Sequence, residues 1–370
     1  MGCCGSKKVE PNPIITPQIS PPIKEQQEPK FQPAEELPPP NTENESPVIV
    51  ESKEASIKIY GKRVQLPTIT YCFDYDALLF YCYDLEENTW ITNDLRQSTN
   101  NCPTNPLVAF QEIRTKQQAK ETLANTSLIA LSNEHIYMIG GYHPLYSNLT
   151  YNIKENRFTF NEKMTKNRNR ILPNLCTVEN YIYCVSGDEI DFYSTRFDRY
   201  DRQSDTWDEL PDLPSAHGLG NSQCVIDHGN LKIFTIGGLA SKMPRVYNLN
   251  ISIFDFKTQR WEVTLLENCI LKVPKFIRAP IVQDMLGLVL ILGEERSYEC
   301  FSFDFETNKF EARAKLARAD DYNKPGFPGE AAYHDGYVVM PYKRNDLKSA
   351  GEKKVSLHRN TVSSDTWDII

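Results

Sequence analysis

Hydrophobic and polar positions along this chain form a pattern of short strands that repeats from about residue 51 to residue 370. In five segments an aromatic residue followed by Asp or Asn precedes a second aromatic residue by seven positions. A polar turn, such as Asp205-Thr206, separates the two aromatics, so each segment predicts two strands joined in a hairpin with both rings facing inward. The five pairs are Tyr83 and Trp90, Tyr151 and Phe158, Tyr200 and Trp207, Phe254 and Trp261, and Phe303 and Phe310.

A second element recurs upstream of these hairpins. Residues 128–142 contain two apolar strands around the turn Asn133-Glu134 and end in the pair Gly140-Gly141. Residues 221–238 repeat this arrangement and end in Gly237-Gly238. A glycine pair at a strand end permits backbones to approach where a side chain would clash. Weaker copies lie at 175–187, 279–293 and 330–342, and a sixth hairpin at 357–367 keeps Trp367 but has Asn360 in place of the aromatic.

The repeating unit therefore has four strands and about 53 residues, and it occurs six times. Regular strand units of this length predict an all-β, six-bladed β-propeller. The glycine pair, the Tyr-Asp dipeptide and the following Trp resemble the kelch repeat, over residues 51–370. A WD-type propeller is the rival, because Trp207-Asp208 and Trp367-Asp368 occur, but Trp opens the last strand here and no Gly-His partner recurs.

The repeat leaves two points of the fold open. Blade 1 has no glycine pair, and we expect residues 68–84 to supply its second and third strands and residues 55–60 its first. The ring closes either with every blade made in chain order or with an N-terminal strand completing the last blade. We also expect Trp207 and Trp261 to occupy equivalent buried positions in adjacent blades.

The first fifty residues have a different composition. They hold 11 of the chain's 24 prolines, four Lys and seven Glu, and Phe31 is their only aromatic residue. Such a stretch cannot bury enough apolar surface to offset its ordering entropy, so residues 9–50 are expected to be a disordered Pro/Glu-rich linker. The formal charge of -8 for the whole chain argues against a nucleic-acid partner.

Residues 1–8, MGCCGSKK, resemble an N-myristoylation signal in which Gly2 accepts the acyl chain. One myristoyl group holds a protein only marginally, with a partition constant of ~10⁴ M⁻¹, so palmitate on Cys3 or Cys4 is expected as the second anchor. Lys7 and Lys8 add attraction to anionic lipid. No secretory h-region follows, and the longest apolar run, 285–293, is too short to span a bilayer. We expect a lipoprotein attached to the cytoplasmic face of a membrane.

Catalytic signatures are missing from the sequence. There is no GxxxxGK[ST], HExxH or GxSxG motif, and the six histidines share no ligand spacing. We therefore expect no enzyme, no cofactor and no metal. The alternative is a six-bladed propeller enzyme of the sugar-isomerase or copper-oxidase type with an axial site. Most cysteines lie in apolar runs and are expected to be reduced, small, buried hydrophobes.

The remaining expectation is a membrane-tethered interaction scaffold. Loops between second and third strands and the links between blades emerge on one face of a propeller, and here they contain interleaved Arg, Lys and Tyr. Such side chains dominate interface energetics and suit an acidic or phosphorylated protein partner. The expected partner-binding residues are Tyr142, Arg168, Arg170, Arg245, Arg278 and Lys343.

Overall fold

A computed structural model of the chain describes its backbone in fourteen segments. These are residues 56–59, 62–65, 67–74, 79–100, 126–141, 148–161, 170–266, 280–283, 289–294, 297–305, 307–316, 327–328, 330–343 and 355–369. All of them belong to the second of two compact units, Ser52–Ile370. The linker and lipidation predictions concern the first unit, Met1–Glu51, which lies outside the described residues.

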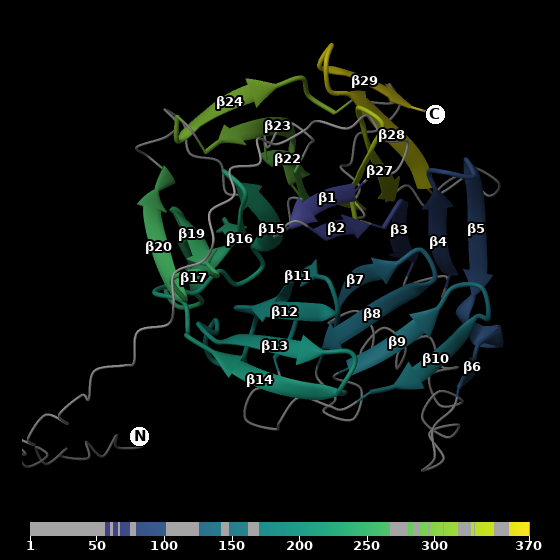
Figure 1. Cartoon of the computed structure of the whole chain (residues 1–370), viewed down its shortest axis with the longest axis horizontal. Coiled ribbons are helices and arrows are strands. Elements are labelled where there is room, and N and C mark those ends of the chain that lie inside the picture. The colour runs from purple at the N-terminus through teal and green to yellow at the C-terminus, as the bar shows by residue number, and fades with distance from the viewer. Residues whose placement is uncertain are drawn as a thin grey trace, which may run out of the picture. The chain divides into compact units, whose positions relative to one another are not determined.

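The described part of the chain is all-β, apart from one short 3₁₀ turn at Leu95–Gln97. Six sheets follow one another along the sequence and form a ring, which confirms the predicted six-bladed β-propeller (Figure 1). Blade 1 contains β3 (Ile69–Asp74), β4 (Leu79–Asp84) and β5 (Thr89–Asp94). Blade 2 contains β7 (Thr126–Ser132), β8 (His135–Gly140), β9 (Asn148–Asn152) and β10 (Arg157–Phe160). Blade 3 contains β11 (Asn174–Val178), β12 (Tyr181–Val185), β13 (Phe197–Asp201) and β14 (Thr206–Leu210).

The last three blades repeat the same order of strands, from the inner strand to the outer one. Blade 4 contains β15 (Asn221–Asp227), β16 (Asn230–Ile236), β19 (Asn250–Asp255) and β20 (Arg260–Leu265). Blade 5 contains β21 (Ile281–Gln283), β22 (Val289–Glu294), β23 (Ser297–Asp304) and β24 (Lys309–Arg313). Blade 6 contains β26 (Ala332–His334), β27 (Tyr337–Lys343), β28 (Val355–Thr361) and β29 (Thr366–Ile369). Shorter strands add to this frame: β6 (Thr99–Asn100) pairs with β10, β17 (Leu239–Ser241) pairs with β18 (Val246–Tyr247), and β25 (Phe327–Pro328) pairs with β27.

The aromatic pairs of the sequence pattern are direct cross-strand partners in the outer hairpin of each blade. Tyr83 lies opposite Trp90 and Phe254 opposite Trp261, and in blade 6 Asn360 lies opposite Trp367. The ring centroids of the five aromatic pairs are 4.8–5.2 Å apart. Cross-strand aromatic pairs are among the more stabilising contacts of a sheet. The predicted register is confirmed.

The turn between the paired strands explains why Asp or Asn follows the first aromatic. The carboxylate of Asp255 accepts hydrogen bonds from the backbone N–H groups of Lys257 and Thr258, at 2.7 and 2.9 Å. Asx side chains stabilise turns in this way. The residue five positions after the aromatic, or after Asn360 in blade 6, has positive φ, at 47–55°: Asn88, Asn156, Asp205, Gln259, Asn308 and Asp365.

Burial differs between the two members of each pair. Tyr151, Phe254 and Phe303 on the third strands are 0% exposed, and they pack into clusters that join neighbouring blades. Trp207 and Trp261 on the outer strands are only half-buried, so the expectation that they are buried is wrong, although their positions are equivalent. The reason is that the fourth strand forms the rim, where the indole keeps one edge in solvent. The indole N–H of Trp261 donates to the carbonyl oxygen of Pro211 at 2.8 Å.

Blade 1 differs from the expectation in its first strand. Residues 68–84 form the predicted hairpin, β3 with β4, but β1 (Ser56–Ile59) pairs with β2 (Lys62–Gln65) and with no other described strand. Two residues separate β1 from β2, so these strands close on each other as a local hairpin. The described part of blade 1 therefore has three strands.

The ring closes with the blades in chain order. All described strands of blade 6 come from the C-terminal part of the chain. At the closing contact, the backbone N–H of Glu330 donates to the carbonyl oxygen of Tyr71 at 3.0 Å, and the hydroxyl of Thr70 donates to the carbonyl oxygen of Glu330. The hydroxyl of Tyr71 accepts the backbone N–H of Ala130 in blade 2 at 2.9 Å. One tyrosine thus links blades 6, 1 and 2.

Candidate functional site

The glycine pairs lie where the loop after a second strand meets the link that enters the next blade. A Cβ on Gly140 would lie 2.4 Å from the carbonyl oxygen of Arg170, and one on Gly238 would lie 2.4 Å from that of Gly218. Both glycines have positive φ, 87° and 79°. The predicted close approach of backbones is confirmed at both pairs.

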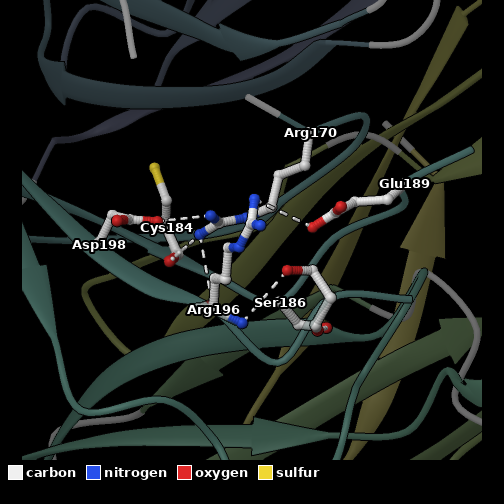
Figure 2. Close-up of polar contacts among 7 residues, drawn as sticks. Arg170, Cys184, Ser186, Glu189, Arg196 and Asp198 are labelled. Atoms are coloured by element: carbon white, nitrogen blue, oxygen red, sulfur yellow. Dashed lines mark hydrogen bonds and ion pairs between the residues drawn. The ribbon is translucent and has the colours of Figure 1, made fainter. Parts of the chain in front are cut away.

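Arg170 lies at the end of the link between blades 2 and 3, and only 1% of it is exposed. Its guanidinium donates to a carboxylate oxygen of Asp198 at 2.5 Å and to the carbonyl oxygen of Cys184 at 2.7 Å (Figure 2). Gly187 leaves room for its aliphatic stem, since a Cβ there would lie 3.0 Å from the Arg170 Cγ and Cδ. The expectation that Arg170 meets a partner at a solvated rim is wrong: its charge is neutralised inside the blade.

The loop between the second and third strands of blade 3, residues 186–196, is held in place by its own polar groups. The hydroxyl of Ser186 donates to the carbonyl oxygen of Ser194 at 2.7 Å, and Arg196 forms an ion pair with Glu189 at 3.3 Å (Figure 2). Ser186 and Ser194 are fully buried. This loop therefore has a defined shape although it contains no long strand.

His217, in the link between blades 3 and 4, is buried and has both ring nitrogens hydrogen-bonded. Burial lowers its pKa to about 4, against a weaker opposing effect of the Gly237 carbonyl. The neutral ring carries one N–H, so Nδ1 donates to the carbonyl oxygen of Gly237 at 3.0 Å and Nε2 accepts the hydroxyl of Ser252 at 2.8 Å. His217 thus anchors the link to blade 4.

Lys242 joins the loop of blade 3 to the hairpin β17–β18 of blade 4. Its ammonium forms an ion pair with Asp188 and donates to the carbonyl oxygen of Ile190 at 3.1 Å. It also lies 5.3 Å from the ring centroid of Tyr193, whose pKa is raised, mainly by burial and secondarily by Asp188. Two loops that are about fifty residues apart in sequence therefore form one continuous surface.

Large apolar side chains project from this surface. Met243 is 94% exposed, Ile190 86% and Phe192 52%, and Val246 is also exposed. Arg245 lies among them, with its guanidinium 5.6 Å from the ring centroid of Tyr247. We call these five residues the loop surface: Ile190, Phe192, Met243, Arg245 and Val246.

The other predicted site residues are not brought together by the described structure. Tyr142, Arg168 and Arg278 lie outside the described residues, as do Gly2, Cys3 and Cys4. Lys343 ends β27, where only the backbone is described. Arg245 is the predicted partner-binding residue that the structure places in an exposed position. The apolar members of the loop surface do not follow from the pattern of Arg, Lys and Tyr in the loops; the signal for them is the hydrophobic residues inside otherwise polar loops.

The described cysteines are free thiols. Cys72, Cys82, Cys176, Cys184 and Cys300 are buried and Cys224 is half-buried, as expected for small hydrophobes. Burial raises the pKa of the Cys82 thiol to about 12. A thiol that stays protonated at neutral pH is a poor nucleophile and metal ligand.

The described residues contain neither a membrane-spanning helix nor a cluster of metal-ligating side chains. No helix among them has the length and apolarity to cross a bilayer, and no group of three or more His, Cys, Asp or Glu side chains gathers there as it would around a metal ion. No protein-family model matches the sequence. No curated protein matches it either.

Proposed function

We propose that this chain is a membrane-tethered adaptor of the kelch type, whose propeller binds a protein partner through the loop surface. The observation that carries the proposal is the exposure of Ile190, Phe192 and Met243 on loops fixed by Lys242. Exposed apolar side chains that gather on one surface mark interaction sites more often than scattered ones do. Because the loops are already ordered, little conformational entropy is lost on binding.

The exposed Arg245 of the loop surface suits an acidic or phosphorylated group on the partner, while the exposed Asp191 between Ile190 and Phe192 suits a cation. Arg245 is exposed, while the neighbouring cations are neutralised within the protein: Lys242 by Asp188 and Arg196 by Glu189. A guanidinium can hold a carboxylate or phosphate through two parallel hydrogen bonds. We therefore propose a partner that places apolar side chains against Phe192 and Met243 and an anionic group against Arg245.

Replacing Phe192 and Met243 together by Asp is expected to weaken partner capture at least ~10-fold, because both apolar anchors are lost. Folding should be unchanged, since Met243 is almost fully exposed. The measurement compares the proteins retained by the parent and by the variant, identified by mass spectrometry. Ile369→Asp, on the outer strand of blade 6 and 38% exposed, is the matched control and should retain the parent's partner. Equal retention by the double variant would refute the loop surface as the partner site.

The proposed tether is a separate part of the function and has a separate test. Gly2→Ala removes the myristoyl acceptor and is expected to release the protein into the soluble fraction. Cys3→Ser with Cys4→Ser leaves one acyl chain, so weak and reversible binding should remain. Membrane fractionation of the full chain measures both. If the Gly2 variant still sediments with membranes, the tether does not depend on Gly2, and the loop-surface result is unaffected.

A further inference from the structure

Two cysteines lie on the inner strands of neighbouring blades. Cys176 is on β11 of blade 3, and Cys224 is on β15 of blade 4. The two strands contact each other along the boundary between these blades. Cys176 is 0% exposed, whereas Cys224 is half-buried. The boundary therefore contains two thiols from segments that are about fifty residues apart in the sequence.

The alternation of side chains along each strand turns both cysteines toward the opposite blade. Cys176 and Val178, two positions apart on β11, lie in one apolar cluster with Ile233 of blade 4. Cys224 and Ile226, two positions apart on β15, pack against the same cluster. The two thiol groups share a hydrogen bond. Cys176 and Cys224 are thus in direct contact across the boundary between the blades.

The other cysteine of blade 3 is Cys184, on β12. It lies opposite Leu175 in the strand register, one position away from Cys176, so its side chain is on the other face of the sheet. On that face it belongs to the cluster between blades 2 and 3. Cys176 therefore has Cys224, and not Cys184, within reach.

The surroundings of the two thiols decide which one is oxidised first. Burial, together with the hydrogen bond to Cys224, raises the pKa of the Cys176 thiol well above its usual value. A thiol that stays protonated reacts slowly, because the thiolate is the nucleophile. Cys224 is the one described cysteine that is not fully buried. We therefore expect oxidation to begin at Cys224.

We propose that Cys176 and Cys224 form a reversible disulfide between blades 3 and 4 when the protein is exposed to hydrogen peroxide. The Cys224 thiol loses its proton and its sulfur attacks one peroxide oxygen. The O–O bond breaks, the sulfur becomes a sulfenic acid, and the other oxygen leaves with that proton as water. The sulfur of Cys176 then attacks the sulfenic sulfur, the S–O bond breaks, and the Cys176 proton leaves in a second water. Two thiols are oxidised and one peroxide is reduced, and a small thiol such as dithiothreitol restores both cysteines by exchange.

Mass spectrometry of the full chain tests whether the bond forms. The reduced protein is treated with hydrogen peroxide, its remaining thiols are blocked with N-ethylmaleimide, and it is digested without reductant. We expect a linked pair of peptides that contain Cys176 and Cys224 and that dithiothreitol separates. If peroxide leaves the two residues unlinked, or links either of them to a different cysteine, the proposal is wrong.

Thermal unfolding tests whether the bond forms in the folded propeller. A cross-link between segments this far apart restricts the unfolded chain, so Tm should rise by ~5 °C on oxidation and fall again with dithiothreitol. Cys224→Ala should fold, because the residue is only half-buried, and should show no such rise. Cys184→Ala is the matched control, since it removes a buried thiol of the same blade from the other face, and it should rise like the parent.

Two outcomes of the thermal experiment would overturn the proposal. An equal rise in Cys224→Ala would show that another modification stabilises the oxidised protein. An unchanged Tm in the parent would show that the two sulfurs do not join within the folded blades. The proposal depends on neither the protein partner nor the membrane tether, so both measurements are made on the purified chain alone.

Discussion

Replacing Phe254 by Ala is expected to lower the free energy of unfolding by ~3–5 kcal/mol. The side chain is 0% exposed and lies between blades, with ring centroids 4.9 Å from Phe197 and 5.2 Å from Trp261. The truncation leaves a cavity at this contact, and the loss is large compared with the ~5–15 kcal/mol that stabilises a typical domain. Denaturant unfolding of the variant and the parent measures it.

Trp261→Phe is the matched control for this prediction. It removes the hydrogen bond to Pro211 and the exposed edge of the indole but keeps an aromatic ring opposite Phe254. Blades 2 and 5 already have Phe at this position, Phe158 and Phe310. We expect a loss of about 1 kcal/mol, the net value of one hydrogen bond. A loss as large as that of Phe254→Ala would show that the rim tryptophan, and not the third-strand aromatic, carries the contact between blades.

Replacing Arg170 by Met is expected to destabilise the propeller by ~3–5 kcal/mol, because it leaves a buried carboxylate without its counter-charge. Asp198 is 2% exposed and accepts the Arg170 guanidinium at 2.5 Å. The carbonyl oxygen of Cys184 also loses its donor. Thermal and denaturant unfolding of the full chain give the size of the loss.

The double variant Arg170→Met with Asp198→Leu separates charge burial from packing. If the loss comes from removing the Arg170 charge beside the buried carboxylate, the double variant should be more stable than Arg170→Met alone. If the losses in free energy of unfolding of Arg170→Met and Asp198→Leu simply add in the double variant, the charge explanation is wrong. A loss under about 1 kcal/mol for Arg170→Met alone would also contradict it. Reversing Arg170 to Glu would place two carboxylates together in the core, so that change cannot serve as a probe of partner binding.

The repeat could be predicted because its signals are local. In five of the six blades the outer hairpin has an aromatic residue on its third strand, an Asp or Asn directly after it, and a residue with positive φ five positions after the aromatic, as at Phe254, Asp255 and Gln259. All three requirements fall within eight residues of sequence. The pattern therefore fixes the strand register without information from the rest of the fold.

The candidate site could be predicted only in part, because it depends on contacts between distant segments. Arg170 is an ordinary loop residue in the sequence, and only its pairing with Asp198, 28 residues away, shows that it is buried. Lys242 orders a loop of the preceding blade more than fifty residues upstream. The exposure of Phe192 and Met243 follows from these long-range contacts, whereas residue type alone would place both in the core.

The contact that closes the ring has a consequence for synthesis on the ribosome. Thr70 and Glu330 are separated by 260 residues, so the inner strand of blade 1 lacks its last neighbour until nearly the whole chain has been made. At a translation rate of ~5–20 residues per second, this interval lasts roughly 10–50 s. During that time the flank of β3 that later meets β27 is open to other nascent chains. We therefore expect the inner strand of blade 1 to stay without this neighbour for longer during synthesis than the inner strands of blades whose neighbours are made next.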